Sequence, residues 1–254
     1  DYLVKRKKGD VVYLSEFEFG LNFSRDNRSA SFENLFGTVS TTGNRLYIGN
    51  NVTNISADLI FNADKLFYNF YGEMEPDVKA EAEGTLELDA IEQIFNINTL
   101  WVEYKNIEWE NDDPFKVEFF TDTTHLENFN LSNEGASLKA DGYLLGNGNQ
   151  NLSFSISELP GKIIDVYLLN TREGNLNSQI NLKSLIKGTL EEPEIELNID
   201  VNDVIVSGIN FGNLLCDFNY INNNLIADIS FINSKFDLNN PLLKLNSNVP
   251  IYLG

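Results

Sequence analysis

Apolar and polar residues alternate along most of the 254-residue chain. In the segment "EIELNID", residues 194–200, isoleucine and leucine alternate with glutamate, asparagine and aspartate. A period of two is typical of a β-strand with one buried and one exposed face, because successive side chains point to opposite sides of the strand. The same period recurs in segments around Phe17 and Leu214. The sequence therefore predicts an all-β protein.

Short polar segments separate the predicted strands. "TTGN" at 41–44, "GNGN" at 146–149 and "INNN" at 221–224 contain the Asn and Gly residues that tight hairpin turns favour. Short connections join strands that are neighbours in a sheet, so we expect a long antiparallel meander rather than parallel β-α-β units. Because no Pro- or Gly-rich linker divides the chain, residues 1–254 are predicted to form one continuous segment.

Two stretches interrupt the alternation. "SELPGKIIDVYLL", residues 157–169, places Leu159, Ile163 and Tyr167 at helical spacing after a Ser157 cap. It predicts a short helix that covers an open end of the sheet. "AIEQIF", residues 90–95, predicts one further helical turn.

Charge and cysteine content narrow the classes of partner. Lys plus Arg number 18 against 38 Asp plus Glu, a net charge of −20, which disfavours nucleic acid and anionic membrane surfaces. The acidic residues are scattered, as expected for solvated strand faces. The single cysteine, Cys216, excludes an internal disulfide and leaves the cellular compartment open.

The start of the chain, "DYLVKRKKGD", has neither an initiator Met nor the apolar stretch of a signal peptide. We expect a piece cut from a longer chain. No apolar run reaches the roughly 18 to 20 residues that cross a bilayer as a helix. The basic residues at 5–8 are interpreted as a strand-end or linker charge run.

Candidate chemistry is sparse. His125 is the only histidine, and no nucleotide-binding loop, serine-hydrolase motif or paired-cysteine motif occurs. "ENDDP", residues 110–114, is predicted to be a turn because it lacks the spacing of a calcium loop. Trp101 and Trp109, eight residues apart, are predicted to share one strand face and to belong to the core. We predict no enzyme, no metal site and no cofactor.

A sheet with one apolar face must cover that face with a second sheet, a partner or a ligand. Two tightly packed halves would form a closed sandwich with a structural or adhesive role. Halves that stand apart would line a trough suited to hydrocarbon chains. A third alternative is a carbohydrate-binding module that uses the aromatic residues. The alternation alone does not separate them.

Residues 84–254 carry a series of motifs in a characteristic order. "IEWENDDPFKVEFFTDTTHLENFNLSNEGASLKADGYLLGNGNQNLSFSIS" (107–157) is followed by the short helical segment, by "GTLEEPEIELNIDVNDVIVSGINFGNLLCDFNY" (188–220) and by "SNVPIYLG" (247–254). This order resembles the AsmA/TamB superfamily, and most closely its TamB members, the long periplasmic components of the translocation and assembly module. Residues 1–83 are compatible with the same family and are weakly assigned.

The resemblance implies a β-taco, a long sheet folded lengthwise into a groove with an apolar interior. It implies that the groove conducts phospholipid acyl chains from the inner to the outer membrane, with a linked role in outer-membrane biogenesis and protein secretion. It further implies a periplasmic location in a diderm bacterium, an inner-membrane anchor on the full-length protein, and docking to an outer-membrane barrel of TamA/BamA type. Strand parity selects the lipid-facing lining: Phe17, Phe19, Leu21, Ile195, Leu197, Ile199, Leu214, Phe218, Ile229 and Phe231.

Overall fold

The fold is all-β, as predicted. The computed structural model describes residues 2–5, 11–25, 35–48, 51–74, 77–88, 93–145, 148–168, 176–189, 192–206, 208–232 and 243–247. Within these ranges the chain forms antiparallel strands and one short helix. It divides into two compact units, Asp1–Thr121 and Asp122–Gly254. The single continuous segment expected over 1–254 stays a prediction.

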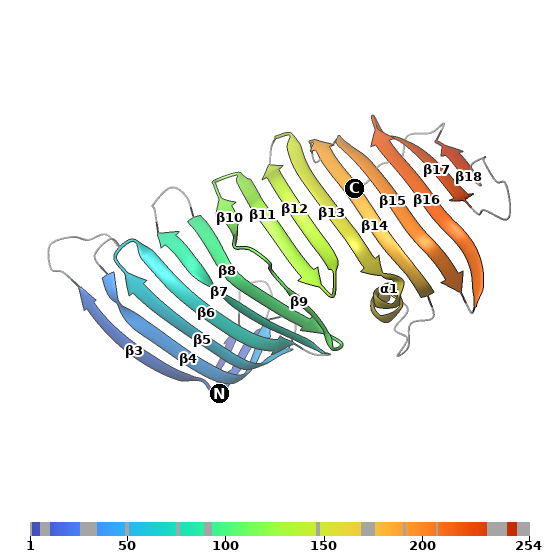
Figure 1. Cartoon of the computed structure of the whole chain (residues 1–254). Coiled ribbons are helices and arrows are strands. Elements are labelled where there is room, and N and C mark those ends of the chain that lie inside the picture. Colours follow the sequence, from blue (N-terminus) through green and yellow to red (C-terminus); the bar gives the residue numbers. More distant parts are fainter. Residues whose placement is uncertain are drawn as a thin grey trace. The chain divides into compact units, whose positions relative to one another are not determined.

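The first unit is an antiparallel meander (Figure 1). Its strands β2 and β3 follow each other along one side of β4, β2 beside the end of β4 and β3 beside its start. From β4 to β8 each strand pairs with the next, and β8 pairs in addition with β9 and β10. The strands are β1 (Tyr2–Lys5), β2 (Val11–Ser15), β3 (Glu18–Arg25), β4 (Leu35–Ile48), β5 (Asn51–Asn62), β6 (Lys65–Met74), β7 (Val78–Leu88), β8 (Gln93–Tyr104), β9 (Ile107–Glu110) and β10 (Phe115–Phe119).

The second unit is a simpler meander in which every strand pairs with the next one along the chain. The neighbouring strands form a single layer, with the helix at one end of β13 (Figure 1). Its elements are β11 (Thr123–Asn133), β12 (Ala136–Leu145), β13 (Gln150–Pro160), α1 (Gly161–Leu168), β14 (Leu176–Gly188), β15 (Pro193–Val206), β16 (Ile209–Ile221), β17 (Asn224–Ile232) and β18 (Leu243–Asn246).

The turn predicted at 221–224 is confirmed. Asn222 and Asn223 join β16 to β17 with φ of 52° and 62°. Two consecutive positive φ values characterise a type I′ turn, whose twist matches that of the flanking strands. The Tyr220 hydroxyl donates a hydrogen bond to Oδ1 of Asn223 at 3.0 Å. In the turn predicted at 146–149, Gly146 and Asn147 lie outside the described residues.

The turn predicted at 41–44 is wrong, because these residues lie inside β4. Thr42 is opposite Glu18 of β3 on one side and Ser56 of β5 on the other, so both edges of this stretch are paired. A Cβ at Gly43 would overlap the ring of Phe17, so the glycine leaves room for that ring. The glycine therefore accommodates a close approach, not a reversal of the chain.

The helix predicted at 157–169 is confirmed in a shorter form, Gly161–Leu168. The Ser157 cap is wrong, because Ser157 belongs to β13 and lies opposite Ser137. Pairing with β14 resumes after the bulge at Glu158 and continues as far as Pro160, which faces Gln179, so these residues belong to the strand and not to the helix. Ile163 of the helix is 2% exposed.

The helical turn predicted at 90–95 is wrong where the structure describes it. Residues 93–95 begin β8 and pair with both β7 and β10, so two neighbouring strands extend them.

The predicted common face of Trp101 and Trp109 is wrong too. A turn at Lys105 and Asn106 places Trp109 on β9, where it lies opposite Val102, so Trp101 points to the other face. Residues 111–114 connect β9 to β10, as expected for a turn.

A recurrent bulge bends the first strand of successive hairpins in the second unit. In β11, β13 and β15 the register with the following strand shifts at one residue of positive φ. Its backbone N–H donates a hydrogen bond to an Asp or Asn side chain on that following strand, an arrangement we call a capped bulge. Bulges increase local twist and bend the strand. The donor and acceptor pairs are Asn128 and Asp141 (3.0 Å), Glu158 and Asn181 (2.9 Å), and Asp203 and Asn213 (3.1 Å).

Candidate functional site: the apolar sheet faces

An unbroken row of apolar side chains crosses all eight strands of the second unit. Residues directly opposite each other in an antiparallel pair point to the same face, so the register defines this row without ambiguity. We call it the long apolar row. Its members, from β11 to β18, are Leu131, Leu138, Ile156, Leu182, Ile199, Cys216, Ile229 and Leu243.

The row beside it is polar throughout and points to the opposite face, because each member directly precedes or follows a member of the apolar row. We call it the long polar row. Its members, from β11 to β18, are Asn130, Lys139, Ser155, Lys183, Asn198, Asp217, Asp228 and Lys244. Asn198 Nδ2 donates a hydrogen bond to Asp217 Oδ1 at 2.6 Å, and Lys244 lies 3.8 Å from Asp228.

The seven lining residues predicted in this unit lie together on its apolar face. Ile199 and Ile229 belong to the long apolar row. The other five pair among themselves or with further apolar residues: Leu197 faces Phe218, Leu214 faces Phe231 and Val201, and Ile195 faces Tyr220. All seven are half-buried.

Burial on this face is partial. Cys216 is 8% exposed and Ala227 fully buried, whereas Leu243 and Leu245 on β18 are 44% and 46% exposed. A core residue between two packed layers is normally buried almost completely. Most of the apolar face of this unit is therefore screened by its own neighbours in the sheet and keeps some contact with solvent.

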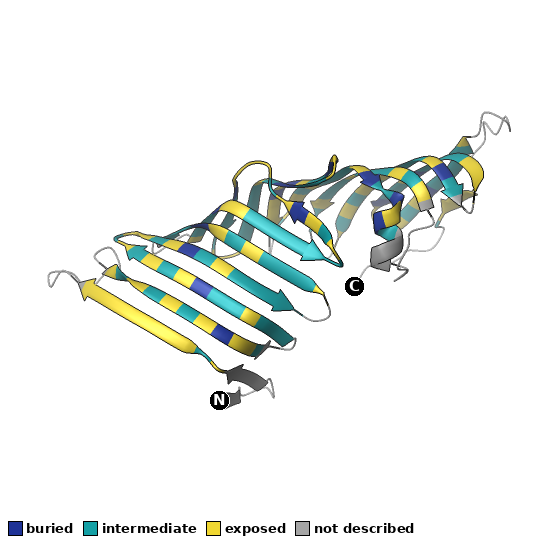
Figure 2. Cartoon of the chain, turned by 60° about the horizontal axis from the view of Figure 1, so that its bottom comes forward, coloured by how far each residue is buried: buried dark blue, intermediate teal, exposed yellow. Residues whose placement is uncertain are grey.

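The other three predicted lining residues, Phe17, Phe19 and Leu21, lie at or beside β3 in the first unit. Phe17 lies over Gly43, and its ring stacks on that of Phe19 with centroids 5.9 Å apart. Phe19 is 62% exposed and Leu21 67% exposed. Figure 2 shows that β3 is exposed along its length.

A second apolar row crosses the first unit from this exposed strand. Burial rises steeply along it, from 67% exposure at Leu21 to 6% at Tyr68 and 7% at Phe115. The sheet of this unit is therefore well packed towards β6, β8 and β10 and poorly covered at β3. The row comprises Leu21, Val39, Leu59, Tyr68, Gly84, Ile97 and Phe115.

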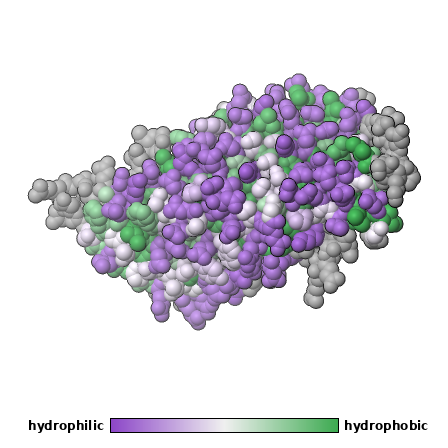
Figure 3. Space-filling view, viewed as in Figure 1, coloured by the Kyte–Doolittle hydropathy of each residue, from purple (hydrophilic) through white to green (hydrophobic). Residues whose placement is uncertain are grey.

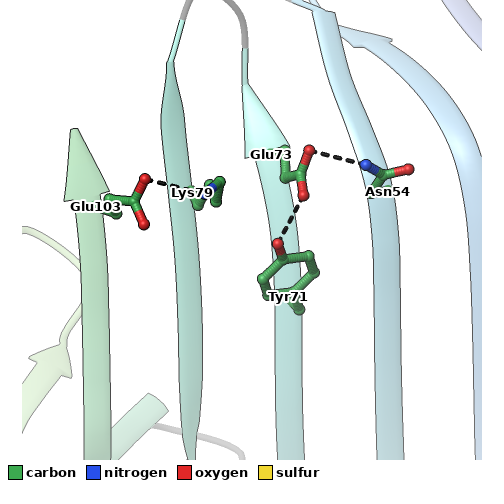
Figure 4. A network of polar contacts seen from close by, with 5 residues as sticks. All are labelled: Asn54, Tyr71, Glu73, Lys79 and Glu103. Carbon is green, nitrogen blue, oxygen red and sulfur yellow. Dashed lines mark hydrogen bonds and ion pairs between the residues drawn. The ribbon is translucent and has the colours of Figure 1, made fainter. Parts of the chain in front are cut away.

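The opposite face of the first unit carries a polar network across β5 to β8 (Figure 4). Glu73 accepts hydrogen bonds from the Tyr71 hydroxyl at 2.7 Å and from Asn54 Nδ2 at 2.8 Å, and these donors hold the pKa of the Glu73 carboxyl below its usual value. Lys79 Nζ lies 2.9 Å from Glu103 Oε1, and this hydrogen bond raises the pKa of Lys79. Hydrophilic residues cover most of the surface turned to the viewer in Figure 3.

Three features bear on chemistry. The ring of His125 stacks on Tyr143 with centroids 4.0 Å apart and planes 6° apart. An open hollow of about 300 Å³ in the first unit is lined by the carboxylates of Asp58 and Glu83 and by the apolar side chains of Ile60 and Phe67. Burial raises the pKa of the Cys216 thiol, with a smaller contribution from Asp217.

Alternation identified the two sheet faces but not the capped bulges or the row that joins β3 to β10. The bulge acceptors are ordinary Asp and Asn residues, and no sequence spacing distinguishes them from their neighbours. The signal that could have revealed them is the pairing register, which emerges only when the strands are assembled.

No helix among the described residues is long and apolar enough to span a membrane. Comparison with family models, with curated proteins and with solved structures finds no match for this chain.

Proposed function

We propose that the chain shields phospholipid acyl chains along its apolar face, as one segment of a lipid-conducting β-groove of AsmA/TamB type. The observation that carries this proposal is the long apolar row, backed by the long polar row on the other face. A half-exposed apolar surface that crosses eight strands needs an apolar cover, and an acyl chain is a cover of matching chemistry.

The energetics suit a conduit. Each methylene removed from water contributes about 0.8 kcal/mol, so a long acyl chain is retained without a dedicated pocket. Seven of the eight members of the row are leucine or isoleucine, and the eighth is Cys216; this nearly uniform apolar lining favours movement along it. Strands lie about 4.8 Å apart, so eight of them extend over roughly 35 Å.

Two rival functions receive less support from the same residues. A closed structural sandwich buries its apolar faces almost fully, whereas most of this face is half-buried. A carbohydrate-binding module built on the two tryptophans needs them open to solvent, whereas Trp109 is 6% exposed and Trp101 is half-buried. Neither observation favours a second candidate.

The proposal extends to the cellular setting that the sequence resemblance implies. The chain would work in the periplasm, its full-length form anchored in the inner membrane and docked to an outer-membrane barrel of TamA/BamA type. Its role in outer-membrane biogenesis and protein secretion would follow from lipid supply.

The first test is organic extraction of detergent-free protein followed by mass spectrometry of the co-purified lipid. We expect phospholipid in near-stoichiometric amount. A folded, monodisperse sample without lipid that also fails to take up a fluorescent phospholipid from vesicles would contradict the proposal.

A matched pair of variants on β17 tests the face. Ile229→Asp puts a charge into the long apolar row, whereas Ile226→Asp puts the same charge on the opposite face, where Ile226 lies opposite Asn219 and is 46% exposed. An unpaired charge is costly on an apolar surface. We expect Ile229→Asp to reduce lipid content by about tenfold or more and Ile226→Asp to leave it unchanged. Equal lipid in both variants, with circular dichroism showing that both are folded, would exclude this face as the binding surface.

A further inference from the structure

Among the described residues of the first unit, β3 carries the most exposed large apolar side chains and has one edge without a pairing strand. Phe19, Leu21 and Phe23 point to one side of it and are 62%, 67% and 46% exposed. Within the described ranges β3 pairs with β4 alone, since β1 pairs with β2. Among the described strands, none pairs with the outer N–H and C=O groups of β3.

Edge strands are normally protected by charged side chains, by short length or by a bulge. The strand β18 shows two of these devices, because it is four residues long and carries Lys244. The strand β3 has eight residues, and its two charged residues, Glu18 and Arg25, stand at its two ends. The residues between them at 19–23 carry no charge, so the middle of this edge is an apolar stripe without a protecting charge.

Charge around β3 permits a second copy of the chain to approach, despite the net charge of −20. Residues 36–44 of the neighbouring β4 contain no charged side chain. Glu18 begins β3 and Glu16 precedes it, whereas Asp58 is on β5, Glu73 on β6 and Glu83 on β7. Residues 19–23 of β3 carry no charge, so their pairing with a second copy brings no like charges directly opposite each other.

The sequence of β3 is also self-complementary. The segment "FGLNF", residues 19–23, has the same apolar and polar order in both directions around Leu21. In an antiparallel pair of two β3 strands, Leu21 would lie opposite Leu21 of the second copy, and Phe19 opposite Phe23. Glu18 would lie opposite Ser24, so no like charges would meet directly.

We infer that β3 is a homodimerisation edge, at which two copies of this chain pair antiparallel about a two-fold axis through Leu21. A two-fold interface uses the same patch on both subunits, and the palindromic stripe meets this condition. Pairing gives hydrogen-bond partners to the outer N–H and C=O groups of β3. It also places the side chains of Phe19, Leu21 and Phe23 beside their counterparts in the second copy. It joins the apolar face of the first unit to that of the second copy.

Sedimentation velocity over a concentration series tests the association. We expect the protein to dimerise and Leu21→Lys to weaken dimerisation by about tenfold or more, because two lysines would oppose each other at the axis. The control is Ile209→Lys, a substitution at a similarly exposed residue (60%) on β16, which should leave the dimer intact. A protein that is monomeric throughout, or a dimer equally sensitive to both variants, would overturn the inference.

Cysteine cross-linking tests the register in a Cys216→Ser background. Directly opposite residues have Cα atoms about 4.5 to 5.5 Å apart, within the range of a disulfide. Leu21→Cys should therefore form a covalent dimer under mild oxidation. Ser24→Cys should form no covalent dimer. Position 24 would lie opposite Glu18 of the second copy, six residues or about 20 Å from position 24 of that copy. Efficient cross-linking at 24 and none at 21 would exclude the two-fold pairing, even if the protein proved dimeric.

Discussion

The ring of Tyr68 lies across Gly84 on the adjacent strand, and its hydroxyl donates a hydrogen bond to the carbonyl oxygen of Asn96 at 3.3 Å. Glycine weakens a strand because it has no side chain to pack, and an aromatic ring laid over it restores the contact. Tyr68 is 6% exposed, and burial raises its pKa. The pair fills the middle of the apolar row of the first unit.

Gly84→Ala should destabilise the first unit. A Cβ at this position would overlap the Asn96 carbonyl oxygen and the Tyr68 ring. Overpacking of this kind costs about 1–3 kcal/mol, measurable by urea denaturation. Gly20→Ala is the control, because its new Cβ would meet its nearest neighbour at 3.8 Å, an ordinary contact. Equal stability of the two variants would show that both the Asn96 backbone and the Tyr68 ring shift at little cost.

The capped bulge of β13 should depend on Asn181. Asn181→Ala removes the oxygen that accepts the Glu158 N–H at 2.9 Å. A lost hydrogen bond of this type costs about 0.5–1.5 kcal/mol. Amide hydrogen exchange at Glu158 should accelerate in the variant and remain unchanged in Asn177→Ala on the same strand. Unaltered protection of Glu158 would mean that the bulge needs no cap.

The β16–β17 turn should reject a β-branched residue at its first position. Asn222 has a φ of 52°, a conformation that costs most L-residues about 1–2 kcal/mol and that asparagine tolerates. We expect Asn222→Val to lower the free energy of unfolding by this amount and Asn222→Gly to leave it nearly unchanged. A similar loss in both variants would point to a role for the Asn222 side chain itself.

Tyr71→Phe should raise the pKa of Glu73. The Tyr71 hydroxyl is the main cause of the lowered pKa, and Asn54 is the second. NMR titration of the Glu73 carboxyl carbon gives the shift directly. Because the pKa of Glu73 is lower in the folded state, its contribution to stability is present above the unfolded value, about 4.3, and is lost as pH falls through the folded value. Tyr71→Phe should therefore reduce the loss of stability on acidification; an unshifted Glu73 pKa would refute this.

Cys216 should alkylate slowly in the folded protein. Its thiol is buried in the long apolar row between Ile199 and Ile229, and burial raises its pKa, so little reactive thiolate forms near neutral pH. Iodoacetamide labelling followed by mass spectrometry gives the rate of alkylation. We expect this rate to be about tenfold or more lower in the folded protein than in urea-unfolded protein. Equal rates would mean that β15 to β17 open readily.

Much of the fold could be predicted because strand alternation is a local signal. The faces of β15, β16 and β17 follow directly from it, as does the turn at Asn222 and Asn223. The errors occur where a partner strand or ring overrides local preference. Gly43 reads as a turn residue until Phe17 is placed over it, and residues 93–95 read as helical until β7 and β10 extend them.

The candidate site was predictable in composition but not in extent. The alternation of side chains along each strand selected Ile199 and Ile229 as members of the apolar face. Only the pairing register shows that they belong to one row across eight strands. Parity also fails wherever a bulge or turn intervenes. Trp101 and Trp109 differ by an even number, yet the turn at Lys105 and Asn106 puts them on opposite faces.

The capped bulges have a consequence for how such a chain can evolve. Each of the hairpins β11–β12, β13–β14 and β15–β16 contains both its bulge and the side chain that caps it. A hairpin of this kind carries its own curvature and contacts chiefly the strands on either side. Duplication or deletion of a whole hairpin would lengthen or shorten the sheet without disturbing the bend of the rest. The width of the sheet in the second unit can thus be adjusted in steps of two strands and becomes a heritable, nearly modular trait.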